Sequence, residues 1–183
     1  STEVAVEVTP SFYAQNYIAS YHWAARRAEL FIKSRQIFKK DKFKKTLDKI
    51  RVAGDEVLSF SPVEESSKNK VALEDTAASA VAFAYITKLY WLASPYNLRR
   101  MLDRQFPRDI AVGIHIGPAA LVPIPKKKGE NIQIASLHIN VTKRIENQAR
   151  EGSESRIFVS YDVADMFKGW LERHQKLAVK HRS

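Results

Sequence analysis

Hydrophobic positions along the chain follow two periods, which separate the segments expected to form strands from those expected to form helices. Residues 3–9 alternate valine with polar or small residues, which predicts a strand. Residues 13–40 repeat aromatic and aliphatic side chains at helical spacing, which predicts a long helix. The elements expected after it are two strands within 47–61, helices at 72–93 and 97–104, a strand at 109–118, a short strand at 132–136, a helix at 138–150, a strand at 155–160 and a helix at 161–171.

Turn signals separate these segments. Pro95 ends the helix at 72–93, because proline cannot continue a helix. The segments 62–70 and 123–131 are polar or basic with proline at their ends, and both are predicted to be loops. Helices that alternate with strands, one strand pair forming a tight hairpin, favour an α+β fold. We expect a ferredoxin-like βαββαβ core, with helices on one face of a mainly antiparallel sheet.

Composition narrows the class of protein. The chain has 183 residues, of which 45% are hydrophobic and 27% charged, as in an ordinary globular domain. It has no cysteine, which excludes disulfides, thiolate zinc sites and cysteine nucleophiles. The net charge of +10 favours an anionic partner such as a nucleotide, a nucleic acid or a membrane surface, although solubility alone would also explain it.

Membrane insertion and export are not expected from the sequence. The most apolar stretch, 76–93, contains Lys88 and follows Glu74 and Asp75, so a buried helix fits it better than a membrane span. Residues 1–9 alternate polar and apolar side chains without a basic start, so no signal peptide is predicted. We therefore expect a cytoplasmic location.

The stretch "KIRVAGDEVLSF" (49–60) places a carboxylate in the turn between two apolar strands. A plain hairpin turn needs only the glycine and a short polar residue, and Asp55 could simply cap its own backbone. A metal or phosphate site would also require a carboxylate at this position.

Three blocks resemble the catalytic domain of class III nucleotidyl cyclases. They are "DKIRVAGDEVLSF" (48–60), "IAVGIHIGP" (110–118) and "INVTKRIENQAREGSESRIFVSYDVADMF" (139–167), and they occur in the family's order at similar spacing. The resemblance implies a nucleotidyl cyclase homology domain over residues 1–170, followed by a basic C-terminal tail at 171–183. It also implies conversion of a nucleoside triphosphate to a 3′,5′-cyclic nucleotide and pyrophosphate.

The resemblance further implies two divalent metal ions, Mg²⁺ or Mn²⁺, held by two carboxylates. Such ions stabilise the attacking and leaving oxygens in phosphoryl transfer. Asp55 matches the second carboxylate, and Glu7 falls where the family has the first, an aspartate. The extra methylene of Glu7 would displace an ion as strict in its geometry as Mg²⁺, and Glu7 could instead be a solvated strand residue.

The phosphate-binding turn also departs from the family. Pro10 replaces the family's glycine, and proline lacks the backbone N–H that would contact a phosphate. The hydroxyls of Thr9 and Ser11 could partly substitute.

The second half of the implied site comes from the other protomer of a head-to-tail homodimer. Asn140 and Arg144 match the family's pair that orients the ribose and holds phosphate charge. They are four residues apart and share one helical face, as two solvated residues also could. A guanidinium suits phosphate because it donates two parallel hydrogen bonds.

The implied base pocket does not fit adenine. Lys49 matches the lysine of adenylyl cyclases, but Leu137 falls where an aspartate or threonine would meet the base. Leucine cannot hydrogen-bond the adenine amino group, which leaves a pyrimidine such as uracil or cytosine, loose specificity, or no substrate. In this respect the chain resembles the pyrimidine cyclases of bacterial antiphage signalling.

Two other functions stay open from the sequence. Glu7, Pro10 and Leu137 also suit a degenerate cyclase-like module that binds nucleotide or only dimerises. A basic nucleic-acid-binding domain of similar build is the third hypothesis, because residues 33–45 interleave Phe with Lys, but the basic end of a helix explains that run better, and no nucleic acid is expected. The histidines show no metal-ligand spacing, and His115 is expected to be a core or hydrogen-bonded residue.

Overall fold

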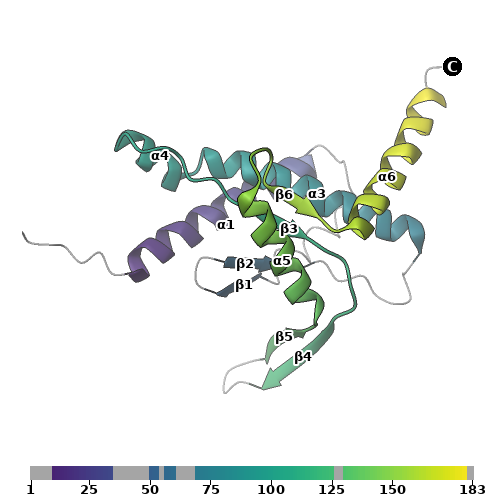
Figure 1. Cartoon of the computed structure of the whole chain (residues 1–183), viewed down its shortest axis with the longest axis horizontal. Helices are drawn as coiled ribbons and strands as arrows, with labels where there is room; N and C mark the ends of the chain where they lie inside the picture. Colours follow the sequence, from purple (N-terminus) through teal and green to yellow (C-terminus); the bar gives the residue numbers. More distant parts are fainter. Residues whose placement is uncertain (1–9, 35–49, 54–55, 61–68, 126–129, 181–183) are drawn as a thin grey trace, which may run out of the picture. The chain divides into compact units, whose positions relative to one another are not determined.

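The computed structural model describes residues 10–34, 50–53, 56–60, 69–125 and 130–180, which form an α+β fold (Figure 1). The elements in chain order are α1 (Pro10–Ser34), β1 (Ile50–Ala53), β2 (Glu56–Ser59), α3 (Lys70–Leu92), α4 (Pro95–Leu102), β3 (Val112–Ile114), β4 (Ala120–Pro125), β5 (Glu130–Ala135), α5 (His138–Glu151), β6 (Ile157–Val159) and α6 (Tyr161–Lys180). The α+β class predicted from the sequence is thus confirmed. Among the described helices, none has the length and hydropathy needed for a bilayer span.

The predicted elements within the described residues are present, with some different bounds. The strand expected at 109–118 is reduced to β3, and the last helix runs to Lys180 instead of 171. The loop predicted at 123–131 is wrong at both ends, because Pro123 and Pro125 lie in β4 and β5 begins at Glu130. Proline is tolerated in a strand at a sheet edge, so it did not end this one. The predicted strand at 3–9 lies outside the described residues.

Hydrogen bonding joins the described strands into three pairs. The hairpins β1–β2 and β4–β5 are antiparallel, while β3 and β6 are parallel, with Val112 opposite Ile157. The first hairpin confirms the strand pair predicted within 47–61. The common sheet of a ferredoxin-like core stays a prediction.

The chain divides into two compact units, which we call the first unit (1–64 and 82–109) and the second unit (65–81 and 110–183). The division falls inside α3, where no proline, glycine or polar run marks it in the sequence. Each unit has its own packing.

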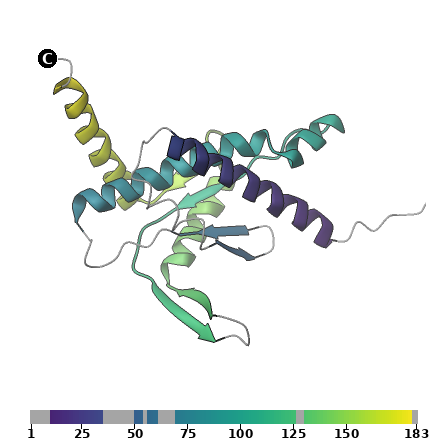
Figure 2. The same cartoon turned by 180° about the vertical axis from the view of Figure 1, so that it is seen from behind.

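In the first unit, α1 packs against the C-terminal part of α3 (Figure 2). The small side chains of Ala25 and Ala28 let Phe83 approach α1 closely, and all three are buried together with Ile32. This arrangement explains why the alanine-rich face of α1 forms the core here.

A buried polar cluster fastens α4 and the segment after it within the first unit. Trp91 Nε1 donates to the carbonyl of Arg108 at 2.7 Å. Asn97 Nδ2 donates to the carbonyls of Trp91 and Arg108, and its Oδ1 accepts from the Arg108 N–H at 2.8 Å. The fully buried Asn97 amide thus has partners for both of its polar atoms, as burial requires.

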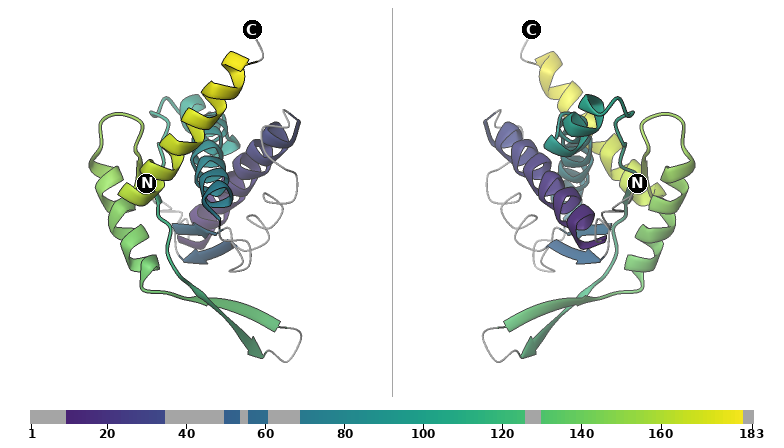
Figure 3. Two further views of the ribbon diagram at one scale, coloured as in Figure 1. Left: turned by 90° about the vertical axis from the view of Figure 1, so that its right-hand side faces the viewer. Right: turned by 90° about the vertical axis from the view of Figure 1, so that its left-hand side faces the viewer.

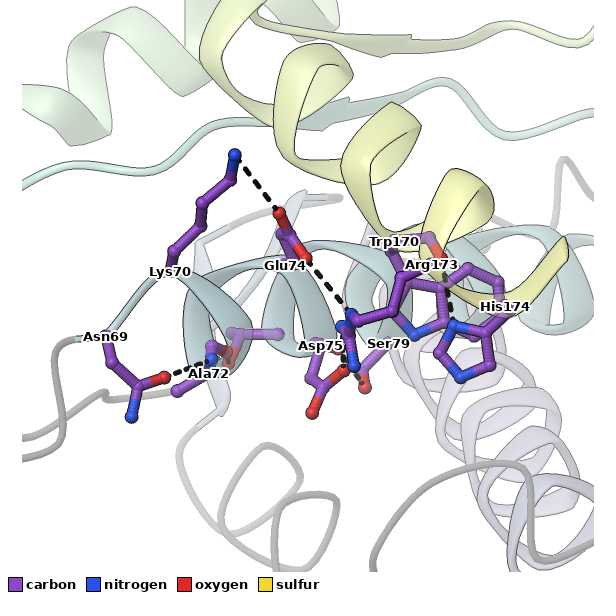
Figure 4. A network of polar contacts seen from close by, with 10 residues as sticks. Asn69, Lys70, Ala72, Glu74, Asp75, Ser79, Trp170, Arg173 and His174 are labelled. Carbon is purple, nitrogen blue, oxygen red and sulfur yellow. Dashed lines mark hydrogen bonds and ion pairs between the residues drawn. The ribbon is translucent and has the colours of Figure 1, made fainter. Parts of the chain in front are cut away.

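In the second unit, the β4–β5 hairpin leads into α5, which packs on β3 and β6 (Figure 3). Elsewhere in this unit, α6 contacts the N-terminal part of α3 through Arg173, which meets both Glu74 and Asp75 (Figure 4). Arg173 lies within the segment 171–183 that the sequence assigned to a basic tail, and α6 is continuous across residue 170.

Candidate functional site

The sequence-predicted site residues are only partly within the described structure. Glu7, Thr9, Lys49 and Asp55 lie outside the described residues. Ser11 lies in the first turn of α1, where only the backbone is described. Leu137 directly precedes α5, and Asn140 and Arg144 lie in the N-terminal half of that helix.

Ser136 fixes the start of α5. Its hydroxyl accepts a hydrogen bond from the N–H of His138 at 3.1 Å and donates to the carbonyl of Pro118 at 2.6 Å. It thereby satisfies one free donor of the helix N-terminus and ties the helix to the segment after β3. Leu137 follows it with a side chain that is 83% exposed.

Two glycines allow β3 and the segment after it to approach α5. A Cβ atom on Gly113 would lie 2.5 Å from Glu146 N and 2.6 Å from Thr142 O, so only glycine fits against the helix backbone. A Cβ atom on Gly117 would lie 2.3 Å from the ring of His138. Both glycines belong to "IAVGIHIGP" and both contact residues at or next to "INVTKRIE", so two separate blocks of the sequence pack together here.

Asn140 and Arg144 lie on the exposed face of α5. Within the described part of the chain, neither side chain has a hydrogen-bond or ion-pair partner. The other cations nearby are engaged, because Glu146 pairs with Lys143 at 3.1 Å and with Arg150 at 2.5 Å. Arg144 is therefore a cation of this face that no described residue engages, and it is open to an external anion.

The structure adds a histidine pair that the sequence analysis did not identify. His115 Nε2 and His138 Nδ1 are 2.7 Å apart, and the two rings stack with centroids 5.0 Å apart. The expectation that His115 is hydrogen-bonded is confirmed. Its partner is 23 residues away, a separation that carries no periodic signal.

The pair affects the titration of His115. Burial, and then the charge of His138, lower the pKa of His115 below its usual 6.5, while the carboxylate of Asp162 acts in the opposite direction. The Nδ1 atom of His115 is buried and has no hydrogen-bond partner among the described residues. The neutral form of this imidazole is therefore favoured.

Metal binding is a prediction that concerns Glu7 and Asp55. Among the side chains that the structure describes, no group of three or more His, Asp or Glu residues is arranged to hold a metal ion. Carboxylate oxygens are nevertheless the ligands that Mg²⁺ and Mn²⁺ prefer, so the two predicted residues suit these ions chemically.

Comparison with known proteins leaves the site to be judged on its own residues. No protein family model, no characterised protein and no solved structure matches the chain. The resemblance to cyclases therefore depends on the three sequence blocks alone.

Proposed function

We propose that the chain is a divergent class III nucleotidyl cyclase that converts a nucleoside triphosphate to a 3′,5′-cyclic nucleotide and pyrophosphate. One observation carries the proposal: β3, from the second resembling block, packs against α5 and pairs in parallel with β6, both from the third. Two parallel strands joined through a helix are the βαβ unit that a ferredoxin-like core contains. That core is part of the proposal.

The exposed face of α5 supplies the groups that the reaction needs from this half of the site. Arg144 can donate two parallel hydrogen bonds to phosphate oxygens, and the Asn140 amide can hold the ribose. The ribose 3′-oxygen would then attack the α-phosphorus as it loses its proton, and the bond to the pyrophosphate oxygen would break. Residues that lie four apart on one helical face can contact both parts of a single nucleotide.

The groups that face the triphosphate from the other side are proposed to be Glu7 and Asp55, with Thr9 and Ser11. Lys49 is proposed to belong to the half that carries Asn140 and Arg144. Two Mg²⁺ or Mn²⁺ ions held by the two carboxylates would supply charge stabilisation during phosphoryl transfer. Ser11 lies in the first turn of α1, and a helix N-terminus favours phosphate.

A head-to-tail homodimer would bring these two halves together. Asn140 and Arg144 point away from the packed side of α5, and no described residue of their own chain engages them. An exposed, unpaired arginine on an ordered helix is what a composite site between protomers requires.

We further propose that the base is a pyrimidine, as in the antiphage cyclases that the sequence resembles. Leu137 offers no hydrogen bond to an adenine amino group, and its side chain lies exposed one turn before Asn140. A smaller base leaves room for this leucine, while Lys49 can donate to a pyrimidine carbonyl.

A catalytically degenerate module is the second candidate, and one observation favours it. Pro10 is the first residue of α1, so the helix N-terminus lacks a backbone donor near the position where phosphate would bind. Such a module would bind a nucleotide, or only dimerise, without turnover.

Incubation with each of the four ribonucleoside triphosphates, first with Mn²⁺ and then with Mg²⁺, followed by chromatography, tests the proposal. We expect a cyclic product, with more product in Mn²⁺ because the longer Glu7 ligand suits looser geometry. Asp55→Ala should abolish the product at unchanged circular dichroism, and Glu7→Asp should narrow the difference between the metals. Binding of labelled nucleotide without product would favour a degenerate module that binds nucleotide. No binding of any nucleotide would contradict the cyclase and leave only a module that dimerises.

A further inference from the structure

The histidine pair lies where the exposed face of α5 begins. His115 follows β3, and His138 is the first residue of α5, one position after Leu137 and two before Asn140. The ring of His138 fills the space beside Gly117, where a Cβ atom would overlap it. The hydrogen bond at 2.7 Å therefore joins the strand segment to the first turn of the helix.

This hydrogen bond depends on how many protons the two rings carry. When the pair is neutral or carries one extra proton, one of the facing nitrogens donates and the other accepts. When both rings are protonated, two N–H groups face each other and two positive charges repel.

The charged groups around the pair determine when that happens. Helix α5 contributes His138 itself and Lys143 and Glu146, which pair with each other. Helix α6 contributes Asp162, and β6 carries no titratable side chain. Asp162 favours protonation of His115, but burial and His138 outweigh it and lower the pKa of His115. The unfolded chain thus binds more protons than the folded one below about pH 6.5, and the contribution of this pair to stability is lost as the pH falls from there through the folded pKa.

We propose that His115 and His138 are positioning residues, whose hydrogen bond holds the first turn of α5 in place only while at most one of the two rings is protonated. Acidification then releases the segment that presents Leu137 and Asn140. The release follows from the geometry alone; its effect on turnover rests on the proposed cyclase function.

Hydrogen exchange measured residue by residue with NMR tests the release without any substrate. The amides of residues 140–143 bond to carbonyls of the first turn, and those of 147–150 report on the rest of α5. Between about pH 7.5 and about pH 5, after correction for intrinsic exchange, protection at 140–143 should fall roughly tenfold for each pH unit by which the pKa of His115 is lowered. Protection at 147–150 should stay unchanged.

Three variants distinguish release of the first turn of α5 through the histidine pair from general destabilisation. His115→Phe keeps a stacked ring without a titrating nitrogen and should remove the pH dependence at 140–143. Gly117→Ala should displace the His138 ring and thereby also remove the pH dependence. His22→Phe, at an exposed histidine of α1, should leave the pH dependence intact. Wild-type protection that is equal at both pH values, or an equal fall in His115→Phe, would overturn the proposal.

Turnover gives a separate readout. If the chain is a cyclase, product formation in the wild type should decline over the same acidic range, and the decline should be smaller in His115→Phe. If exchange depends on pH but no product forms at any pH, the role of the histidine pair is supported and only the proposed cyclase function is contradicted. If product forms but exchange does not depend on pH, the cyclase function is supported and the role of the histidine pair is contradicted.

Discussion

Arg173 donates from Nη2 to Asp75 Oδ1 at 2.7 Å, although the two residues are 98 positions apart in the sequence. The same guanidinium contacts Glu74 Oε2 through Nε at 3.3 Å (Figure 4). The Glu74 side chain is only 6% exposed, so its carboxylate needs this partner to compensate for lost hydration. Arg173 thus connects α6 to α3 within the second unit.

Replacing Arg173 with methionine should therefore destabilise the second unit. Loss of the guanidinium leaves the buried Glu74 carboxylate without its strongest donor, which costs about 1–3 kcal/mol. Urea unfolding monitored by circular dichroism measures this loss. Lys168→Met removes an exposed cation from the same helix and serves as the control; equal midpoints for the two variants would show that the contact contributes little.

Gly113→Ala should displace α5 from β3. The added Cβ atom would press on helix backbone atoms, which cannot rotate away, and overpacking of this kind costs about 1–3 kcal/mol. Gly152→Ala is the matched control, because its nearest neighbour, at 3.1 Å, is the ring of the half-exposed Phe158, which can move. Thermal unfolding should show a clearly larger loss for Gly113→Ala, and a loss equal to that of the control would contradict the close packing.

The contacts of Arg173 and of the histidine pair illustrate what the sequence could and could not predict. Alternating apolar residues around Gly54 and Asp55 correctly predicted the β1–β2 hairpin, and the apolar run before Pro95 correctly predicted α3. Both are local patterns. The contacts of Arg173 and of the two histidines join segments that no periodicity connects, because tertiary packing alone brings them together.

Bounds were least predictable where two local signals conflicted. Pro123 and Pro125 suggested a loop, yet both lie in β4, because pairing with β5 outweighs the turn propensity of an edge proline. Of the candidate site, the sequence placed Asn140 and Arg144 on one helical face, and both are exposed on α5. It could not reveal the closeness of Gly113 to the α5 backbone, which a helical period does not encode.

Mixing two inactive variants tests the composite site. Asp55→Ala and Arg144→Ala should each be nearly inactive alone, since loss of a group that stabilises the transition state costs about 2.7–4 kcal/mol. A heterodimer of the two would contain one intact site, so an equal mixture should recover up to about a quarter of wild-type turnover. No recovery, with heterodimers verified by native mass spectrometry, would contradict a site shared between protomers.

Leu137→Asp tests the proposed base preference. The carboxylate could accept from an adenine amino group, so the ratio of kcat/KM for ATP to that for UTP or CTP should rise by about fivefold or more, equivalent to about 1 kcal/mol. Leu102→Asp, at a leucine of α4 that is also 83% exposed, should leave the ratio unchanged. A wild-type protein that prefers ATP to both pyrimidine nucleotides would contradict the proposed role of Leu137.

The two prolines of β4 also affect how the β4–β5 hairpin meets other molecules. Amides two residues apart point to the same edge of a strand, so Pro123 and Pro125 remove two successive donors from one edge of β4. A proline fits a paired strand when its nitrogen faces away from the partner, which makes this the edge opposite β5. That edge of β4 therefore lacks a continuous row of donors for recruiting a foreign strand, which disfavours edge-to-edge pairing on this side of the hairpin.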